Sequence, residues 1–187
     1  NRIIHGKLTL QRVPVDLHAC VRQALEVSRG DFEAKHLELN VALEAERHQV
    51  LGEAARLRQV FWNLLKNAAK FTPARGRVTV RSRNLTDGGE PWIAVEVVDS
   101  GIGIEPAALA KIFDPFEQGN PDLGRRYGGL GLGLTIARNL VETHGGQLRA
   151  ASAGPGQGAT FTAELPALSH PDAPGELAPT PGAESQR

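Results

Sequence analysis

The segment FWNLLKNAAKFTP, Phe61 to Pro73, combines the pattern of a buried helix with an unusual polar border. At about 100° per residue, apolar side chains gather on one arc of this helix. Three polar side chains beside that arc, Asn63, Asn67 and Lys70, follow the spacing i, i+4 and i+7. The sequence therefore predicts a core-facing helix whose edge presents two carboxamides and an ammonium. The apolar arc consists of Leu57, Val60, Phe61, Leu64, Leu65 and Ala68.

Two interpretations of this polar border stay open on the segment alone. Most polar stripes on amphipathic helices simply contact solvent, which makes an ordinary wet edge the first interpretation. The second is that the stripe faces a ligand with negative charge and a hard metal ion, because carboxamide oxygens suit Mg²⁺ and lysine suits phosphate. The second interpretation requires the remaining parts of a pocket elsewhere in the chain.

Composition limits the possible functions. The 187 residues, of which 41% are hydrophobic, can bury one core and form one domain. Lys and Arg number 21, and Asp and Glu also number 21, so overall charge gives no reason to expect binding to nucleic acid or to an anionic membrane. The single cysteine, Cys20, shares a helical stripe with Leu17, Val21 and Ala24, which predicts a buried core thiol.

The chain reads as a stub, a globular body and a tail. It contains no methionine and starts in what resembles the end of a helix, so we expect a fragment of a longer protein. We assign residues 1–7 to the end of an upstream helix, 8–166 to the body, and 167–187 to a disordered linker or tail rich in proline and alanine. No apolar run approaches the ~18 residues of a membrane span and no signal peptide is visible. We therefore expect a cytoplasmic domain, and leave open whether the parent protein is anchored in a membrane.

Alternation and turn residues outline an α/β fold. The expected class is a two-layer sandwich, in which helices cover one face of a mixed β-sheet. Asp16 is expected to cap a helix that runs towards Ala34, and Gly145 and Gly146 to end the last helix. LTLQRVPV is predicted to be a short edge strand that ends near Pro14. The other predicted strands are LELNVAL (37–43), GRVTVRSRN (76–84), PWIAVEVVD (91–99), QLRAASA (147–153) and GATFTAELP (158–166). Besides the helix that Asp16 caps, helices are predicted after Gly52 and over 132–144, with a loop-rich region over 100–131.

One predicted strand ends in a carboxylate on its core face. Ile93, Val95 and Val97 share a face, and period two places Asp99 on that face as well. A buried carboxylate is costly without a partner, so a hydrogen-bond donor must meet it. Gly101 and the glycine two residues further on would let a flat ligand approach the backbone here. The alternative is that the segment DSG forms a plain turn.

A second glycine cluster, YGGLGLGLTIA, lies at the entrance of the last predicted helix. Backbone N–H groups and the positive helix end make such a place suitable for phosphates. The dinucleotide and protein-kinase glycine patterns both fail because Leu134 stands at the last glycine position, and the chain contains no GxxxxGK[ST] motif. A phosphate site of another kind remains. The glycines of the cluster are Gly128, Gly129, Gly131 and Gly133.

Together these motifs resemble a known family. NLLKNAAKFT, DSGIGI, FDPFEQG and GGLGLGLTIARNLVETHGG are similar, in order and spacing, to the N, first glycine, phenylalanine and second glycine boxes of bacterial sensor histidine kinases. These kinases share an ATPase superfamily with gyrase, mismatch-repair and heat-shock chaperone proteins. The resemblance spans about Leu8 to Pro166 and implies a Bergerat-type ATP site with bound Mg²⁺.

The resemblance also implies roles for individual residues. Asn67 would ligate Mg²⁺ through its carboxamide oxygen, Asn63 would lie alongside, and Lys70 would reach the phosphates. Asp99 would accept a hydrogen bond from the adenine amine, and Thr160 would assist through its hydroxyl or a water.

Further implied contacts come from the glycine and phenylalanine boxes. Gly101 and Gly103 would leave room for the base, and Phe113 and Phe116 would anchor a mobile lid. The resemblance also implies contacts to the phosphates by residues of the lid and the second glycine box, namely Arg125, Arg126, Gly129, Gly131, Gly133 and Leu134. The two arginines have an equally simple interpretation as a solvated pair.

The implied activity is that of a protein histidine kinase. Hydrolytic relatives typically carry Glu where this chain has Asn63, and a carboxamide cannot activate water as a general base. None of the six histidines has the sequence context of a phosphoacceptor, so the acceptor is expected on a dimerisation hairpin upstream of this chain. The expected partners are that hairpin in a homodimeric parent, a response regulator and ATP, but no nucleic acid. The alternatives are a serine kinase of the anti-sigma type and a non-enzymatic nucleotide-sensing module of the same superfamily.

Overall fold

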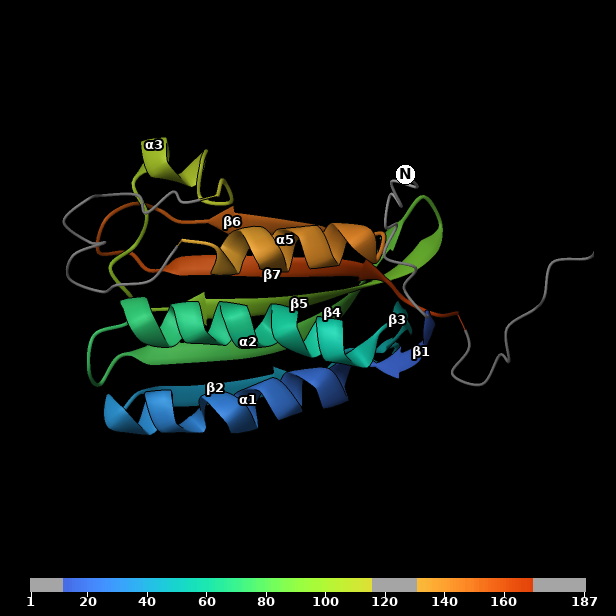
Figure 1. The fold of residues 1–187 in the computed structure, drawn as a ribbon, viewed down its shortest axis with the longest axis horizontal. Helices are drawn as coiled ribbons and strands as arrows, with labels where there is room; N and C mark the ends of the chain where they lie inside the picture. The colour runs from blue at the N-terminus through green and yellow to red at the C-terminus, as the bar shows by residue number, and fades with distance from the viewer. Residues whose placement is uncertain (1–11, 116–130, 170–187) are drawn as a thin grey trace, which may run out of the picture.

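A computed structural model describes residues 12–115 and 131–169. In these ranges, three long helices cover one face of a five-stranded sheet (Figure 1). The predicted α/β sandwich is therefore confirmed. The elements are β1 (Val13–Asp16), α1 (Leu17–Ala34), β2 (Glu38–Leu43), β3 (Gln49–Gly52), α2 (Ala54–Phe71), β4 (Arg77–Asp87), β5 (Glu90–Asp99), α3 (Pro106–Leu109), α5 (Gly133–Thr143), β6 (Gln147–Ala151) and β7 (Ala159–Pro166).

The main sheet has the strand order β2-β4-β5-β7-β6. β2 pairs parallel with β4, whereas the β4–β5, β5–β7 and β6–β7 pairs are antiparallel, so the sheet is mixed as predicted. The turn between β4 and β5 contains Gly88 and Gly89, whose φ angles of 57° and 88° require residues that tolerate the left-handed region. The central hairpin is thus fixed by local turn chemistry.

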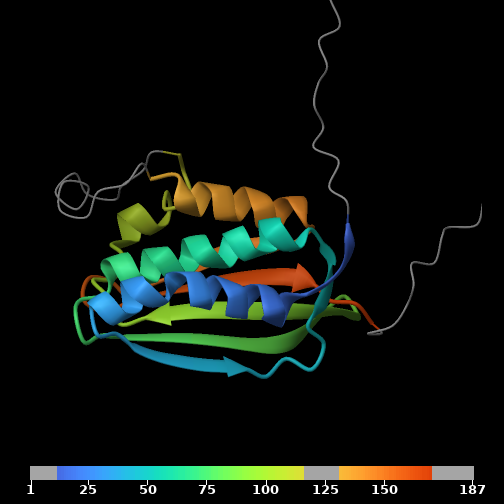
Figure 2. The same cartoon turned by 60° about the horizontal axis from the view of Figure 1, so that its bottom comes forward.

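The core lies between the sheet and the helices (Figure 2). Every residue of the apolar arc on α2 is buried, which confirms the helical pattern read from the sequence. Cys20 on α1 is also buried, and burial raises the pKa of its thiol to about 11, as expected for an inert core cysteine. No helix in the described ranges is long and apolar enough to cross a membrane.

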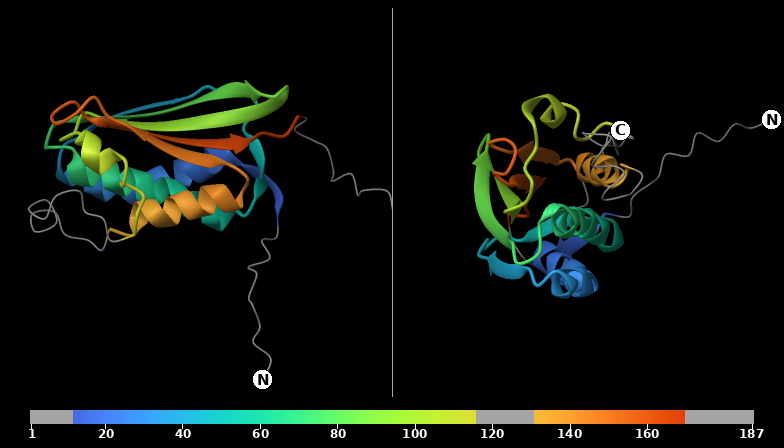
Figure 3. Two further views of the ribbon diagram at one scale, coloured as in Figure 1. Left: turned by 90° about the horizontal axis from the view of Figure 1, so that it is seen from above. Right: turned by 90° about the vertical axis from the view of Figure 1, so that its left-hand side faces the viewer.

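The opposite face of the sheet has no helical cover among the described elements (Figure 3). Charged side chains pair across neighbouring strands on this face. Glu96 of β5, only 7% exposed, accepts hydrogen bonds from Arg81 and, at 3.4 Å, from Arg83, both on β4. These cross-strand pairs explain how a sheet of this kind can keep one face in water.

A small second sheet is the main departure from the predicted strands. β1 begins at Val13, ends at Asp16 and pairs antiparallel with β3, rather than joining the edge of the main sheet. β3 was not predicted, because four residues beside polar loops give too short a pattern. Burial of Val15 and Val50 against the helices holds this ribbon in place.

A polar cluster lies where α1 begins. Asp16 caps α1 as predicted, accepting a hydrogen bond from the Ala19 N–H at 3.1 Å, and its carboxylate also pairs with Nδ1 of His48 at 2.9 Å. The His48 ring stacks on His18, with centroids 4.3 Å apart, and Nε2 of His18 lies 2.8 Å from the Ser82 hydroxyl. Burial, followed by the charge of His48, lowers the pKa of His18 from 6.5 to about 4.

Backbone hydrogen bonds continue beyond the last strand. The N–H of Ala167 donates to the Pro91 carbonyl at 2.9 Å, and the N–H of Leu168 donates to the Gln49 carbonyl at 2.8 Å. The packed chain thus extends at least two residues past the boundary placed at 166. The predicted stub, 1–7, and residues 170–187 of the predicted tail lie outside the described residues.

Candidate functional site

The candidate site lies at one end of the helical layer. There the C-terminal end of α2, the end of β5 and the start of α5 come together, at the left of Figure 1 and opposite the β1–β3 ribbon. The Phe71 carbonyl, the last of α2, accepts a hydrogen bond from the Ile102 N–H after β5. A Cβ built on Gly133, the first residue of α5, would lie 3.6 Å from Oδ1 of Asn63. Three segments distant in sequence therefore border one site.

Asn63 holds an unpaired polar group at the junction of α2 and α5. Its Nδ2 is buried and has no hydrogen-bond partner within the described ranges. An unsatisfied buried donor costs on the order of 1–3 kcal/mol, so this amide is suited to an acceptor that comes from outside the chain. Phosphate oxygens and water are such acceptors.

Asn67 and Lys70 follow Asn63 along the same border of α2, and all three are half-buried. The Lys70 ammonium lies over the Phe71 ring, 4.8 Å from its centroid. Partial burial lowers the pKa of Lys70, because it disfavours the charged form of the ammonium. A nearby anion favours the charged form of a lysine, so the predicted role at phosphates is compatible with this position.

Asp99 occupies the core face at the end of β5, as its alternation predicted. It is 6% exposed and lies opposite Ala159 of β7. Its Oδ1 accepts a 2.8 Å hydrogen bond from the Gly101 N–H, and the backbone N–H groups of Gly101 and Ala159 both act to lower the pKa of the carboxyl. Burial nevertheless raises the pKa of Asp99 despite these two donors. The carboxylate is therefore ready to accept a further donor, such as an amine on a ligand.

The two glycines after Asp99 are needed by the protein's own packing. A Cβ on Gly101 would lie 2.5 Å from both Oδ1 of Asp99 and the Phe71 carbonyl oxygen. Gly103 has a φ of 73°, and its Cβ would lie 2.0 Å from the Gly154 carbonyl oxygen. Close approach of protein groups therefore accounts for both glycines, and room for a base remains a prediction.

Hydrogen bonds fasten the loop after β5 on two sides. The Ile102 N–H donates to the Phe71 carbonyl at 3.1 Å, and the Ile102 carbonyl accepts from Gly156 at 2.7 Å. The Ile104 N–H donates to the hydroxyl of Ser152 at 3.0 Å. Ser152 was not singled out in the sequence, although a serine before a Gly-Pro turn is a typical local capping residue. The loop is thus joined to both α2 and the β6–β7 turn.

Phe113 is held between α5 and the sheet. Its ring meets Phe161 edge-on with centroids 6.5 Å apart, and the Arg138 guanidinium lies 5.4 Å from its centroid. The Thr135 hydroxyl donates to the Phe113 carbonyl at 2.9 Å. These contacts suit an anchor, as predicted for Phe113. The other predicted lid and phosphate residues Phe116, Arg125, Arg126 and Gly129 lie outside the described residues.

The start of α5 presents a backbone suited to an anion. Gly131 has a φ of 68°, Leu132 occupies the N-cap position, and no side chain among the described residues caps the helix there. The first N–H groups of a helix have no partner within the helix, so a helix start of this kind suits an acceptor. Gly133 faces Asn63, whereas Leu134 packs against the core, so only its backbone could take part.

Thr160 is not brought to the site. It lies opposite Val98 in the β5–β7 register, whereas Asp99 lies opposite Ala159. Directly paired residues share a face and neighbours in a strand alternate, so the Thr160 side chain projects from the other face of the sheet. The predicted assistance of its hydroxyl near Asp99 is therefore corrected. The alternation ATFTAEL already places polar residues at 160, 162 and 164 on one face.

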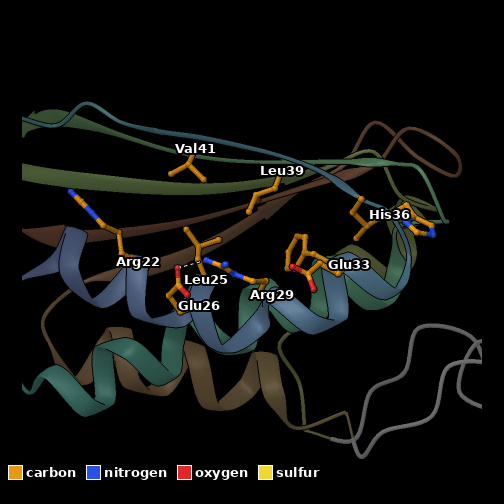
Figure 4. A pocket seen from close by; sticks show the side chains of 10 residues that line it. Arg22, Leu25, Glu26, Arg29, Glu33, His36, Leu39 and Val41 are labelled. Atoms are coloured by element: carbon orange, nitrogen blue, oxygen red, sulfur yellow. Dashed lines mark hydrogen bonds and ion pairs between the residues drawn. The ribbon is translucent and has the colours of Figure 1, made fainter.

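A separate groove lies between α1 and the edge strand β2. Leu25, Leu39 and Val41 point into it (Figure 4), and its volume is about 830 Å³. It contains none of the predicted nucleotide-site residues and lies along the outer side of α1. Its lining consists of Arg22, Leu25, Glu26, Arg29, Phe32, Glu33, His36, Leu37, Leu39 and Val41.

Comparison with known proteins assigns the family. Residues 52–169, well over half of the chain, match the family described as "Histidine kinase-, DNA gyrase B-, and HSP90-like ATPase". Sensor protein TorS of Escherichia coli (strain K12) is 42% identical over 154 residues, which cover 82% of this chain and 16% of TorS. The autoinducer 2 sensor kinase/phosphatase LuxQ of Vibrio cholerae is 36% identical over 184 residues, covering 97% of this chain and 21% of LuxQ. The chain thus spans a small part of these relatives.

Solved structures show the same fold. The mycobacterial sensor histidine kinase MprB superposes with a TM-score of 0.69 at 32% identity, covering 83% of this chain and 97% of that one. Full-length ShkA in complex with AMPPNP superposes with a TM-score of 0.72 at 31% identity, covering 89% and 34%. The chain therefore belongs to the family of histidine kinase-, DNA gyrase B- and HSP90-like ATPases, as an ATP-binding catalytic domain of the sensor histidine kinase type.

Proposed function

We propose that this domain transfers the γ-phosphate of ATP to a histidine on a dimerisation hairpin that precedes it in the full-length protein. The observation that carries the proposal is the buried Nδ2 of Asn63, which has no partner within residues 12–115 and 131–169, beside the start of α5, which no side chain of those ranges caps. A donor and a helix N-terminus converge where phosphates would lie. Asp99 lies beside the α2 terminus, because Gly101 approaches both its carboxylate and the Phe71 carbonyl, and there it can accept a ligand amine.

The two ends of the site suit the two ends of ATP. Asp99 accepts the exocyclic amine of adenine, and that bond offsets the burial that raises the pKa of its carboxyl. Lys70 and the N–H groups at Gly133 stabilise the negative charge of the phosphates. The nucleotide therefore lies across the C-terminal half of α2, with its base towards β5 and its phosphates towards α5.

The residues present fit Mg²⁺. Asn67 is half-buried on the polar border of α2, four residues after Asn63, so its carboxamide oxygen can serve as a ligand. The described ranges contain no cluster of three His, Cys, Asp or Glu residues. Mg²⁺ keeps waters and binds substrate phosphates, so one protein oxygen beside a nucleotide suffices. Bound there, the ion would neutralise charge on the phosphates.

The chemistry favours transfer over hydrolysis. The imidazole nitrogen of the acceptor histidine attacks the γ-phosphorus in line, a P–N bond forms, the bond to the β,γ-bridging oxygen breaks, and ADP leaves. Asn63 binds and positions but cannot remove a proton from water. The phosphoryl group then passes to a response regulator, within a homodimeric parent whose catalytic domain lies in the cytoplasm.

Labelling with γ-labelled ATP tests the proposal. The chain alone should bind ATP but gain no acid-labile phosphate, whereas a longer protein that includes the upstream hairpin should carry label on a hairpin histidine. Rapid hydrolysis by the longer protein without histidine labelling would contradict the proposal. Acid-stable label on a serine of a partner would favour the serine kinase, and binding without any transfer would favour the nucleotide-sensing module.

A further inference from the structure

Lys35 spans the gap between α1 and the end of α2. It is the C-cap residue of α1, and its half-buried side chain reaches the last turn of α2. Its Nζ donates hydrogen bonds to the carbonyl oxygens of Ala69 at 2.6 Å, Lys70 at 2.8 Å and Thr72 at 3.0 Å. An ammonium has three donors, and all three are used here.

The arrangement is suited to lysine in particular. The last carbonyls of a helix have no partner within the helix, and a cation there also interacts favourably with the helix dipole. Three acceptors that converge on a single nitrogen match an ammonium better than a planar guanidinium. The backbone adds a fourth link, because the Lys35 carbonyl accepts from the Arg75 N–H at 2.9 Å.

The Phe71 carbonyl, which lies in sequence between two of these acceptors, links Lys35 to the candidate site. Lys35 binds the carbonyls on both sides of Phe71, and the Phe71 carbonyl accepts the 3.1 Å hydrogen bond from the Ile102 N–H. One residue earlier, the Gly101 N–H donates to Oδ1 of Asp99. The position of the Asp99 loop is therefore tied to the end of α2, which Lys35 fixes.

We propose that Lys35 is a positioning residue of the nucleotide site. By clamping the α2 terminus, it sets the distance between the polar border of α2 and the loop that holds Asp99, without touching the nucleotide. The inference rests on the proposed function, because it assigns Lys35 to the same site. The role of Lys35 goes beyond that function, because none of the sequence motifs described above includes a residue at the end of α1.

The test compares Lys35→Met with a matched core variant. Lys35→Met keeps the aliphatic stem but removes the three donors. Val21→Ala, at a fully buried position near the start of the same helix and far along it from Lys35, lowers stability by removing core volume. Two quantities are measured well below the melting temperature: amide exchange at Ile102 in nucleotide-free protein, and MgADP affinity by calorimetry.

The inference predicts faster exchange at Ile102 and MgADP binding weaker by on the order of tenfold in Lys35→Met, the usual effect of removing a group that orients a ligand-binding residue. Val21→Ala should keep wild-type affinity. Unchanged affinity in Lys35→Met, or an equal loss in both variants, would overturn the positioning role. Failure of the wild-type chain to bind nucleotide at all would instead overturn the proposed function, and this inference with it.

A second variant keeps the test decisive if Lys35→Met does not fold. Lys35→Arg retains a positive charge and donors for the helix carbonyls, but cannot direct three bonds from one nitrogen. We expect it to fold, to exchange faster at Ile102 than wild type and to bind MgADP less tightly. Wild-type behaviour of Lys35→Arg in both measurements would show that charge alone is needed and would reject the geometric clamp.

Discussion

Substituting alanine for Gly101 should destabilise the domain even without nucleotide. The φ angle of Gly101 is not in the positive range, so its backbone could accommodate alanine. The obstacle to alanine is steric. The new methyl would lie 2.5 Å from Oδ1 of Asp99 and 2.5 Å from the Phe71 carbonyl oxygen. An ordinary carbon–oxygen contact is about 3.3 Å, so each of the two oxygens must move away by about 0.8 Å.

Neither oxygen can move without cost. The Phe71 carbonyl is held by the Ile102 N–H at 3.1 Å, and Oδ1 of Asp99 is held by the Gly101 N–H at 2.8 Å. Overpacking of a tight site costs about 1–3 kcal/mol, and loss of one hydrogen bond costs about 1 kcal/mol. We therefore expect Gly101→Ala to lower the free energy of unfolding by about 2–4 kcal/mol.

Urea unfolding of nucleotide-free protein measures this effect, with Gly30→Ala as the control. Gly30 lies on the exposed side of α1, and a methyl group added there would have no atom within 4 Å, so alanine should raise stability by about 0.5–1 kcal/mol. If Gly101 served only to leave room for a base, Gly101→Ala would keep wild-type stability and lose only nucleotide affinity. That result would refute the steric reasoning.

Three further variants test other parts of the molecule. Asn67→Ala should weaken MgATP far more than metal-free ATP in calorimetry, and an equal loss in both would reject its role as a metal ligand. Asp99→Ala should cost ADP affinity on the order of 1–3 kcal/mol, and unchanged affinity would remove Asp99 from the adenine contact. Folding lowers the pKa of His18 from 6.5 to about 4, so between these pH values His18 is protonated in the unfolded state but neutral in the folded state. The free energy of unfolding therefore decreases as the pH falls through this window. His18→Gln should therefore show a loss smaller by up to about 3 kcal/mol over that window in pH-dependent unfolding, and identical pH profiles would contradict the buried neutral histidine.

Periodic patterns made much of the fold and the site predictable. The arc on α2 and the alternation before Asp99 each extend over enough residues to fix which side faces the core. Alternation in β7 could likewise have excluded Thr160 from the site, because the apolar residues of this strand, and not Thr160, occupy the positions that face the core. β3 was missed because a pattern of four residues is too short to be distinguished from a loop.

Other features depend on contacts that no local pattern records. The steric need for Gly101 arises from the Phe71 carbonyl, thirty residues earlier in the chain, and the clamp of Lys35 arises from three carbonyls more than thirty residues later. Backbone carbonyls belong to every residue, so their identity as partners cannot be read from side-chain type. They become visible only when the helices and the sheet are placed together.

The central position of the β4–β5 hairpin bears on the order of folding. A tight turn lets these strands pair locally, whereas β2 on one side and β7 on the other must close much longer loops. α2 precedes the hairpin and α5 follows it, so the two walls of the nucleotide site meet only after both flanking segments have docked. Because nucleotide contacts both walls, we expect it to bind only after both segments have docked, and so to slow unfolding while leaving the folding rate unchanged.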